Sequence, residues 1–143
     1  MKPPIAIQSA VLNKEFSIDY RIYYEDTDAG GVVYYANYLK FFERARTEFL
    51  RSLNISQSEL VKENNLIFVV RKCEIDYKIP ARLDDLITIK TIVLEIGAAS
   101  IKMDQEMFFK EKLLNVLKVE IVCVDSISMK PRKIPTAILE KIK

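Results

Sequence analysis

The sequence contains no histidine, and this absence removes several kinds of active site at once. Ser-His-Asp triads, Cys-His pairs, zinc sites that use histidine and imidazole acid–base catalysis all need the missing ring. Any catalysis by this chain therefore rests on carboxylates, tyrosines or the backbone. Because other metal ligands are also scarce, we expect neither a metal nor another cofactor.

Cysteine is nearly absent too, since Cys73 and Cys123 are the only two. Each lies in an apolar or alternating segment, where a reduced cysteine acts as a small buried hydrophobic side chain. We therefore expect no disulfide framework. No segment approaches roughly 18 consecutive apolar residues, and Met1 to Ala10 lacks the apolar region of a signal peptide. These features predict a cytoplasmic protein without a transmembrane segment.

Glycine occurs only at positions 30, 31 and 97, so the chain has few places for a flexible linker. Half of the 143 residues are hydrophobic and 29% are charged, which is typical of a globular protein. We expect one domain over residues 1–143, because one core can serve a chain of this length. The net charge of +2 is small for a protein that binds the phosphate backbone of a nucleic acid. This small charge disfavours a nucleic-acid partner.

Periodicity predicts a strand and then a long helix. Residues 16–23 alternate between apolar and polar side chains, as in a half-buried strand. Residues 37–53 have helical spacing, with Asn37 as the capping residue. The apolar face holds Tyr38, Phe41, Phe42, Ala45, Phe49 and Leu50, and the charged face holds Lys40, Glu43, Arg44, Arg46, Glu48 and Arg51.

The sequence after the long helix is predicted to form mainly strands. A short helix is predicted over residues 57–62, with Ser56 and Glu59 in a capping-box pattern. Four β-rich segments follow, and the links between them are too short for parallel crossovers, so the strands are antiparallel. The expected fold class is α+β, with one long helix packed on a strongly curved antiparallel sheet. The β-rich segments are 66–79, 85–96, 100–109 and 113–124, and a terminal helix is predicted over 136–143.

An acidic loop follows the first strand, where Glu25, Asp26 and Asp28 precede Gly30 and Gly31. Such a loop is either a solvated neighbour of a helix N-terminus or a place where the backbone approaches a ligand closely. A calcium loop of the EF-hand type is a third option. It fails because its twelfth position is not glutamate and no helix precedes it.

The run YYEDTDAGGVVYYANY over residues 23–38, followed by FERARTE over residues 42–48, resembles the signature of the 4-hydroxybenzoyl-CoA thioesterase family. More narrowly, it is similar to the Tol-Pal-associated acyl-CoA thioesterases. The resemblance implies a hotdog fold, hydrolysis of acyl-CoA to a carboxylic acid and CoA, and a homodimer or homotetramer with sites at subunit interfaces. Further similar segments are FVVRK at 68–72, PARLDD at 80–85, VCVD at 122–125 and MKPR at 129–132.

The same resemblance implies roles for residues of the loop. Asp28 matches the catalytic carboxylate, which attacks the thioester carbonyl or activates a water to do so. Tyr35 lies where backbone N–H groups at the helix start stabilise the oxyanion, and Tol-Pal-type relatives usually carry histidine there. Gly30 and Val33 match substrate-binding positions, and Tyr24 is a candidate wall of the acyl pocket.

The phosphates of CoA need arginine or lysine at the rim of the site. The candidates are Arg71, Lys72, Lys130, Arg132 and Lys133. The turn at residues 97–99, which is basic in some relatives, is here Gly-Ala-Ala, so substrate binding is expected to depend on pantetheine contacts, or the partner is acyl carrier protein. One alternative function is a non-catalytic acyl-CoA or acyl-carrier-protein binding protein on the same fold. Another is a purely structural partner of envelope or phospholipid-synthesis enzymes.

Overall fold

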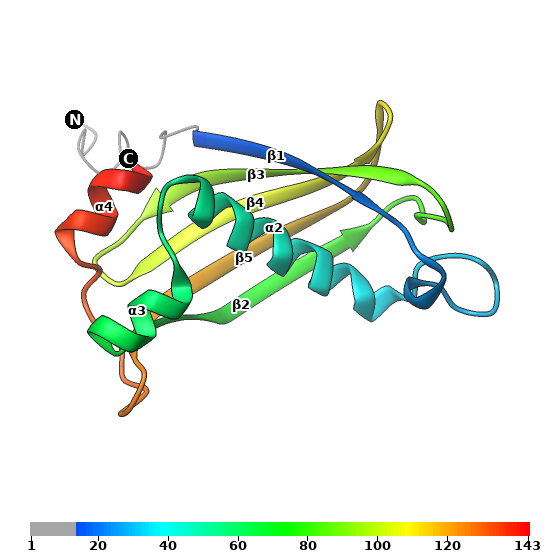
Figure 1. Cartoon of the computed structure of the whole chain (residues 1–143). Coiled ribbons are helices and arrows are strands. Elements are labelled where there is room, and N and C mark those ends of the chain that lie inside the picture. The colour runs from blue at the N-terminus through cyan, green and yellow to red at the C-terminus, as the bar shows by residue number, and fades with distance from the viewer. Residues whose placement is uncertain (1–13) are drawn as a thin grey trace.

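The computed structural model describes residues 14–143, in which a five-stranded sheet curves around one long helix (Figure 1). The order across the sheet is β1-β3-β4-β5-β2, and every neighbouring pair is antiparallel. The α+β class and the hotdog arrangement are therefore confirmed. The strands are β1 (Lys14–Arg21), β2 (Leu66–Tyr77), β3 (Leu86–Ile96), β4 (Ser100–Phe109) and β5 (Lys112–Asp125), and the α-helices are α2 (Tyr38–Ser52), α3 (Gln57–Asn64) and α4 (Thr136–Ile142).

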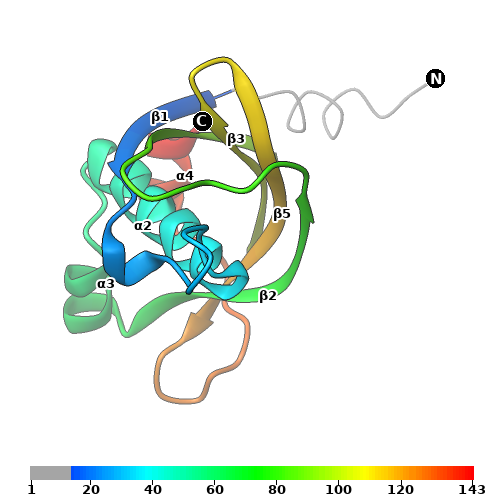
Figure 2. The same cartoon turned by 90° about the vertical axis from the view of Figure 1, so that its right-hand side faces the viewer.

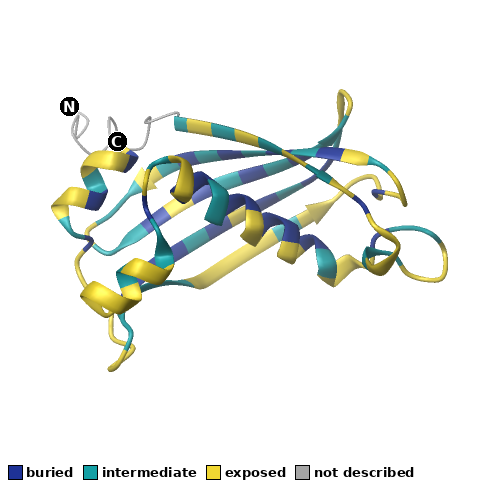
Figure 3. Ribbon diagram, viewed as in Figure 1, coloured by how far each residue is buried: buried dark blue, intermediate teal, exposed yellow. Residues whose placement is uncertain are grey.

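The core lies between α2 and the concave face of the sheet (Figure 2). All six apolar positions expected on the helix are buried, and Phe42 is 0% exposed. Alternate residues of the strands meet them, as in the buried positions Ile87 and Ile89 of β3. The side of α2 that faces the sheet is dark blue in Figure 3, as expected for an amphipathic helix whose apolar stripe supplies the core.

Arg46 departs from the expected charged face of the helix. It is 9% exposed, and its Nη1 donates to Oε1 of Gln105 at 2.8 Å. The Gln105 amide in turn donates to Oγ1 of Thr91 at 2.9 Å and to the carbonyl of Phe42 at 3.0 Å. The placement of Arg46 outside was wrong because the sheet curves far enough around α2 to cover positions beside its apolar stripe.

The first strand ends two residues earlier than predicted. β1 stops at Arg21, and the N–H of Ile22 donates to the carbonyl of Asp85 at 2.9 Å. The carboxylate of Asp26 then accepts from the N–H of Tyr23 at 2.8 Å, which starts a 3₁₀ turn at Tyr24–Asp26. A side-chain acceptor thus replaces the sheet partner, and the chain turns towards the acidic loop.

The two predicted helix caps have different outcomes. Ser56 caps α3 as expected, since its Oγ accepts from the N–H of Glu59 at 3.4 Å. Asn37 occupies the N-cap position of α2, but its side chain makes no capping bond. Its Nδ2 donates instead to the carbonyl of Asp26 at 3.0 Å. Asn37 therefore ties the helix start to the acidic loop, and a 3₁₀ turn at Tyr35–Asn37 leads into α2.

Breaks in strand register help to bend the sheet. They lie in the pairs β2–β5, β3–β4 and β4–β5, and the one in β2 falls between Val70 and Lys72. Bulges of this kind increase local bending and twist. They fit a sheet that wraps around a helix.

The cysteines are both free, and Cys123 is buried as expected. The expectation for Cys73 was wrong, because it lies exposed on β2, which is an edge of the sheet. Within residues 14–143 no helix is long and apolar enough to cross a membrane. One domain over residues 1–143 stays a prediction, and the expectation for Met1 to Ala10 lies outside the described residues.

Candidate active site

Asp28 lies in a tight loop that the backbone closes on itself. Thr27 and Val33 form a β-bridge, and the N–H of Asp28 donates to the carbonyl of Val32 at 2.9 Å. The N–H of Gly31 donates back to the carbonyl of Asp28 at 3.1 Å, and Gly31 has a φ of 78°. Glycine adopts this left-handed conformation at little cost. The loop therefore presents Asp28 at its exposed tip.

The carboxylate of Asp28 is oriented by its own loop. Its Oδ1 accepts from the N–H of Gly30 at 2.8 Å. A Cβ on Gly30 would lie 3.3 Å from that oxygen, so a side chain there would crowd the carboxylate. Burial raises the pKa of Tyr38, the hydrogen bond with Ala81 lowers it, and the charge of Asp28 adds to the rise. Asp28 is thus near enough to the helix start to influence it electrostatically.

The segment at residues 80–85 holds the loop against α2. The N–H of Val33 donates to the carbonyl of Ala81 at 2.9 Å, and the N–H of Ala81 donates to the hydroxyl of Tyr38 at 2.9 Å. Val33 and Tyr38 are both buried. Two segments that carry the family resemblance are therefore joined here by hydrogen bonds.

The helix start faces a small cavity beside the loop. Tyr35 and Ala36 begin the 3₁₀ turn, and the first N–H groups of a helical segment have no acceptor within it. The carbonyl of Tyr35 accepts from the hydroxyl of Tyr77 at 2.9 Å, and Tyr35 is 64% exposed. Sequence reasoning missed Tyr77, because nothing in the pattern of one strand distinguishes it. The cavity has a volume of about 220 Å³ and is lined by Val33, Tyr35, Tyr38, Tyr77, Lys78, Ile79 and Pro80.

Tyr24 does not line this cavity. Its side chain is 83% exposed, while its carbonyl accepts from both the N–H and the hydroxyl of Thr27. Within one chain, Tyr24 therefore contributes its backbone to the loop, and a contact between its ring and the acyl group stays a prediction.

The candidate basic residues on β2 also lie away from Asp28. Arg71 pairs with Glu120 at 2.6 Å, and this interaction is the main cause that lowers the pKa of Glu120. Lys72 borders a hollow on the sheet together with Lys102 and Lys118. Neither side chain lines the cavity beside Tyr35.

The segment between β5 and α4, which carries Lys130, Arg132 and Lys133, lies at the opposite end of the molecule from the acidic loop (Figure 1). Nη1 of Arg132 donates to the carbonyl of Asn64 at 2.7 Å, next to the start of β2. Lys133 is its exposed neighbour in the chain. One chain thus does not bring these candidate phosphate-binding residues to Asp28.

The assembled part of the site is a carboxylate beside a helix N-terminus. Positive potential and unpaired N–H groups at such a terminus stabilise negative charge. Within residues 14–143 no three metal-ligating side chains gather into a possible metal site. The chemistry that these groups can perform is therefore attack on a carbonyl with stabilisation of the resulting oxyanion.

Comparison with known proteins agrees with this geometry. The family model described as the thioesterase-like superfamily matches residues 23–142. An acyl-CoA thioesterase YbgC from Haemophilus influenzae is 49% identical over 125 residues, which cover 87% of this chain and 92% of the relative. The acyl-CoA thioester hydrolase YbgC of Escherichia coli O157:H7 is 48% identical over 124 residues, which cover 86% and 92%.

Solved structures agree as well. The crystal structure of a probable thioesterase from Bartonella henselae has a TM-score of 0.82 and 40% identity, covering 85% of this chain and all of that one. A 4-hydroxybenzoyl CoA thioesterase complexed with 4-hydroxybenzoyl CoA has a TM-score of 0.81, covers 90% of this chain and 99% of that one, and shares the fold at 19% identity. The chain belongs to the thioesterase-like superfamily.

Proposed function

We propose that this chain is an acyl-CoA thioesterase, a hydrolase that converts acyl-CoA to a free carboxylic acid and CoA. The observation that carries the proposal is the carboxylate of Asp28, which Gly30 orients at 2.8 Å in a loop that leads into the first turn before α2. The high identity to proteins named acyl-CoA thioesterase supports it. Release of free thiol from acyl-CoA by the purified protein tests it.

The reaction needs one carboxylate and a site for the oxyanion. In one route Asp28 takes a proton from the attacking water, and the C–S bond breaks as the tetrahedral intermediate collapses to the carboxylic acid. In the other route Asp28 attacks the thioester carbonyl itself, the C–S bond breaks to leave an anhydride on Asp28, and water then hydrolyses this anhydride to the acid and the free Asp28 carboxylate. The N–H groups of Tyr35 and Ala36 stabilise the charge on the carbonyl oxygen. The leaving CoA thiolate takes up the proton. No histidine is required, because a thioester is already an activated acyl group.

The hydroxyl of Tyr35 is expected to be dispensable. The side chain of Tyr35 is exposed, and the main-chain carbonyl of Tyr35 accepts a hydrogen bond from the hydroxyl of Tyr77. The groups that act in this mechanism are main-chain N–H groups. We predict that Tyr35→Phe keeps kcat/KM for acyl-CoA within about threefold of the parent, whereas one general acid or base contributes about 10²- to 10⁴-fold. Steady-state thiol release measures this. A loss of about 100-fold would show that the Tyr35 hydroxyl takes part in the chemistry.

The active assembly is proposed to be a homodimer, or a homotetramer built from two such dimers. β2 is an edge strand, and its free N–H and C=O groups can pair with another strand. A two-fold axis pairs β2 with itself in antiparallel fashion. This pairing brings the Leu66 end of one copy, where Arg132 is bound to Asn64, towards the Tyr77 end of the other, beside Tyr35. Arg132 and Lys133 would then reach CoA across the interface.

The pantetheine arm is expected to supply most of the binding energy for CoA. The turn at residues 97–99 carries no basic side chain. Arg132, which would face CoA across the interface, already donates to the carbonyl of Asn64 and lies 3.8 Å from the carboxylate of Asp125, so its contact with the CoA phosphates is expected to be weak. We predict KM values for acyl-CoA and acyl-pantetheine within about threefold of each other. Acyl-pantetheine lacks the nucleotide and its phosphates, and this loss raises KM strongly only if the protein makes strong hydrogen bonds to those phosphates. Parallel thiol-release assays measure both. A KM that is higher by about 100-fold for acyl-pantetheine would contradict the prediction.

Acyl carrier protein presents the same pantetheine arm and is proposed as a second source of substrate. The association with the Tol-Pal system and the cytoplasmic location, which the sequence and the resemblance imply, stay predictions.

A further inference from the structure

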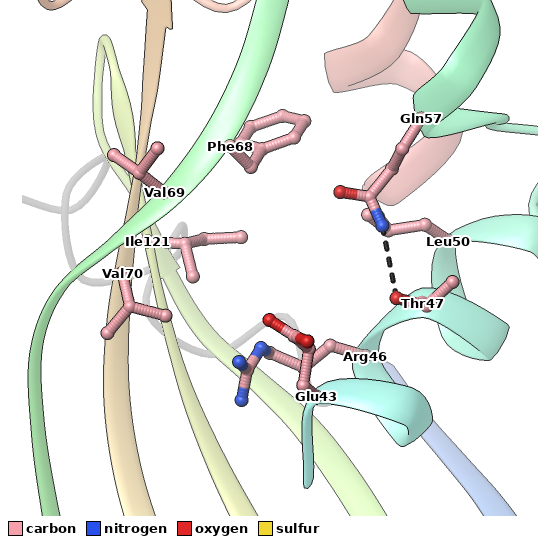
Figure 4. A pocket seen from close by; sticks show the side chains of 9 residues that line it. All are labelled: Glu43, Arg46, Thr47, Leu50, Gln57, Phe68, Val69, Val70 and Ile121. Carbon is pink, nitrogen blue, oxygen red and sulfur yellow. Dashed lines mark hydrogen bonds between the residues drawn. The ribbon is translucent and has the colours of Figure 1, made fainter. Parts of the chain in front are cut away.

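A stripe of four side chains on α2 faces the open β2 edge of the sheet. Its members are spaced so that they share one face of the helix: Leu39, Glu43, Arg46 and Leu50. They line two adjoining cavities of about 580 and 270 Å³ between α2 and β2, and Glu43, Arg46 and Val70 border both. Figure 4 shows Glu43 and Arg46 projecting into the larger cavity from the helix. The stripe is therefore the wall of a groove along the sheet edge.

Arg46 is a buried cation that has no carboxylate partner among the described residues. Its single hydrogen bond is to the neutral amide of Gln105, and no acidic group in residues 14–143 lies within 4.0 Å of it. Burial is the main cause that lowers the pKa of Arg46, and the nearby charge of Glu43 opposes it. An arginine keeps its charge in proteins, and a buried charge is costly unless it is paired. The arrangement thus calls for an anion in the groove.

The groove is also incomplete as a protein surface. Among the residues that the structure describes, no strand lies on the outer side of β2, and most residues of β2 beyond Val70 are exposed (Figure 3). Val70, Tyr77 and Ile79 present exposed apolar side chains along this edge. Long open edges with apolar side chains favour association with another strand. The occupant that fits such an edge best is a second copy, because β2 can pair with itself.

The stripe is complementary to itself when it is turned end to end. Leu39 and Leu50 lie equally far from the point midway between Glu43 and Arg46. A two-fold axis through this point sets α2 antiparallel to its copy, so that leucine faces leucine and glutamate faces arginine. This is the symmetry that antiparallel pairing of β2 imposes on the two copies.

We propose that Arg46 of each copy is neutralised by Glu43 of the other, so that two reciprocal ion pairs join the antiparallel α2 helices. The proposal rests on the homodimer proposed above and names the contacts that hold its helices. It assigns Arg46 a double role, since the same guanidinium binds Gln105 at the centre of its own sheet. Loss of one member of a buried interfacial ion pair weakens association, largely because the other charge is left buried and unpaired.

Charge reversal on both sides of the pair tests the proposal. We expect Glu43→Arg and Arg46→Glu to weaken the dimer by at least about 100-fold each, because each change removes two pairs and creates repulsion. The double variant should restore association to within about tenfold of the parent. Arg44→Glu is the matched control: Arg44 is exposed on the flank that faces Tyr20 of β1, and its reversal should change Kd by less than about threefold. Analytical ultracentrifugation measures the Kd values, and circular dichroism checks folding.

Two results would overturn the proposal. One is a Glu43→Arg variant that associates as tightly as the parent. This result would exclude the ion pairs even if the Arg46→Glu variant does not fold. The other is a double variant as weak as the single ones. If a bound carboxylate neutralises Arg46 instead, sodium octanoate will raise the Tm of the parent while Glu43→Arg leaves association unchanged. Sedimentation does not depend on turnover, so a negative result for the ion pairs does not affect the thioesterase proposal. Conversely, a parent protein that releases no thiol does not affect the proposal of the ion pairs.

Discussion

Replacing Asp28 with Asn is expected to lower kcat/KM for acyl-CoA hydrolysis by about 10²- to 10⁴-fold. The amide has the same shape as the carboxylate, and its oxygen can still accept from the N–H of Gly30. It can neither take a proton from water nor attack the thioester carbonyl. The loop should keep its conformation, because its closing hydrogen bonds involve main-chain groups of Asp28, Gly31 and Val32. Thiol release under steady-state conditions measures the loss.

Glu25→Gln provides the matched control for this change. Glu25 is an exposed carboxylate three residues earlier in the same loop region, and its replacement removes the same charge. We expect kcat/KM within about threefold of the parent, since an exposed charge at this position has only a screened effect on the site. Equal losses in both variants would mean that loop charge, and not the Asp28 carboxylate, controls the rate.

Replacing Phe42 with Ala is expected to reduce the free energy of unfolding by about 3 to 5 kcal/mol. Phe42 is 0% exposed at the middle of α2, where the helix meets the concave face of the sheet. Alanine would leave a cavity there and remove the packing of a whole aromatic ring. The hydrogen bond from Gln105 involves the Phe42 carbonyl and survives the change. Urea unfolding monitored by circular dichroism measures the difference.

Val61→Ala is the comparison for the core substitution. Val61 lies on α3 and is 40% exposed, so its truncation removes little buried area. We expect a loss below about 1 kcal/mol. A Phe42→Ala variant no less stable than Val61→Ala would show that α2 is not the centre of the core.

Much of the fold could be predicted from local patterns. The alternation at residues 16–23, the helical stripe of α2 and the short links between the later strands all reflect neighbours in sequence. Antiparallel pairing followed from the link lengths alone. The capping of α3 by Ser56 was predictable for the same reason, because donor and acceptor are three residues apart.

Properties that depend on distant segments were not predictable in this way. Arg46 is buried because the sheet wraps around α2, and no helical pattern encodes that curvature. Cys73 is exposed because β2 lies at the edge, although β2 is neither the first nor the last strand in the chain. Strand order is a result of tertiary packing, so an alternating segment looks the same at an edge and in the interior.

In the candidate site, too, contacts between residues close in sequence were predictable and contacts between distant segments were not. Asp28, Gly30 and Val33 are close in sequence and meet in one loop, so a motif could predict their neighbourhood. Tyr77 reaches Tyr35 from a strand 42 residues away, and its hydroxyl carries no signal in the sequence. The basic residues are still farther from Asp28 in one chain, since Arg132 is bound beside α3. Their role depends on a second copy.

The reaction proposed for this chain is hydrolysis of the thioester bond of acyl-CoA. The most direct measurement is the release of free CoA thiol by the parent protein from a panel of short, long and aromatic acyl-CoAs, alongside binding of the same compounds by calorimetry. We expect saturable turnover with equal yields of thiol and carboxylic acid for at least one acyl class. Saturable binding without any release of thiol would contradict it and identify a non-catalytic acyl-CoA binding protein.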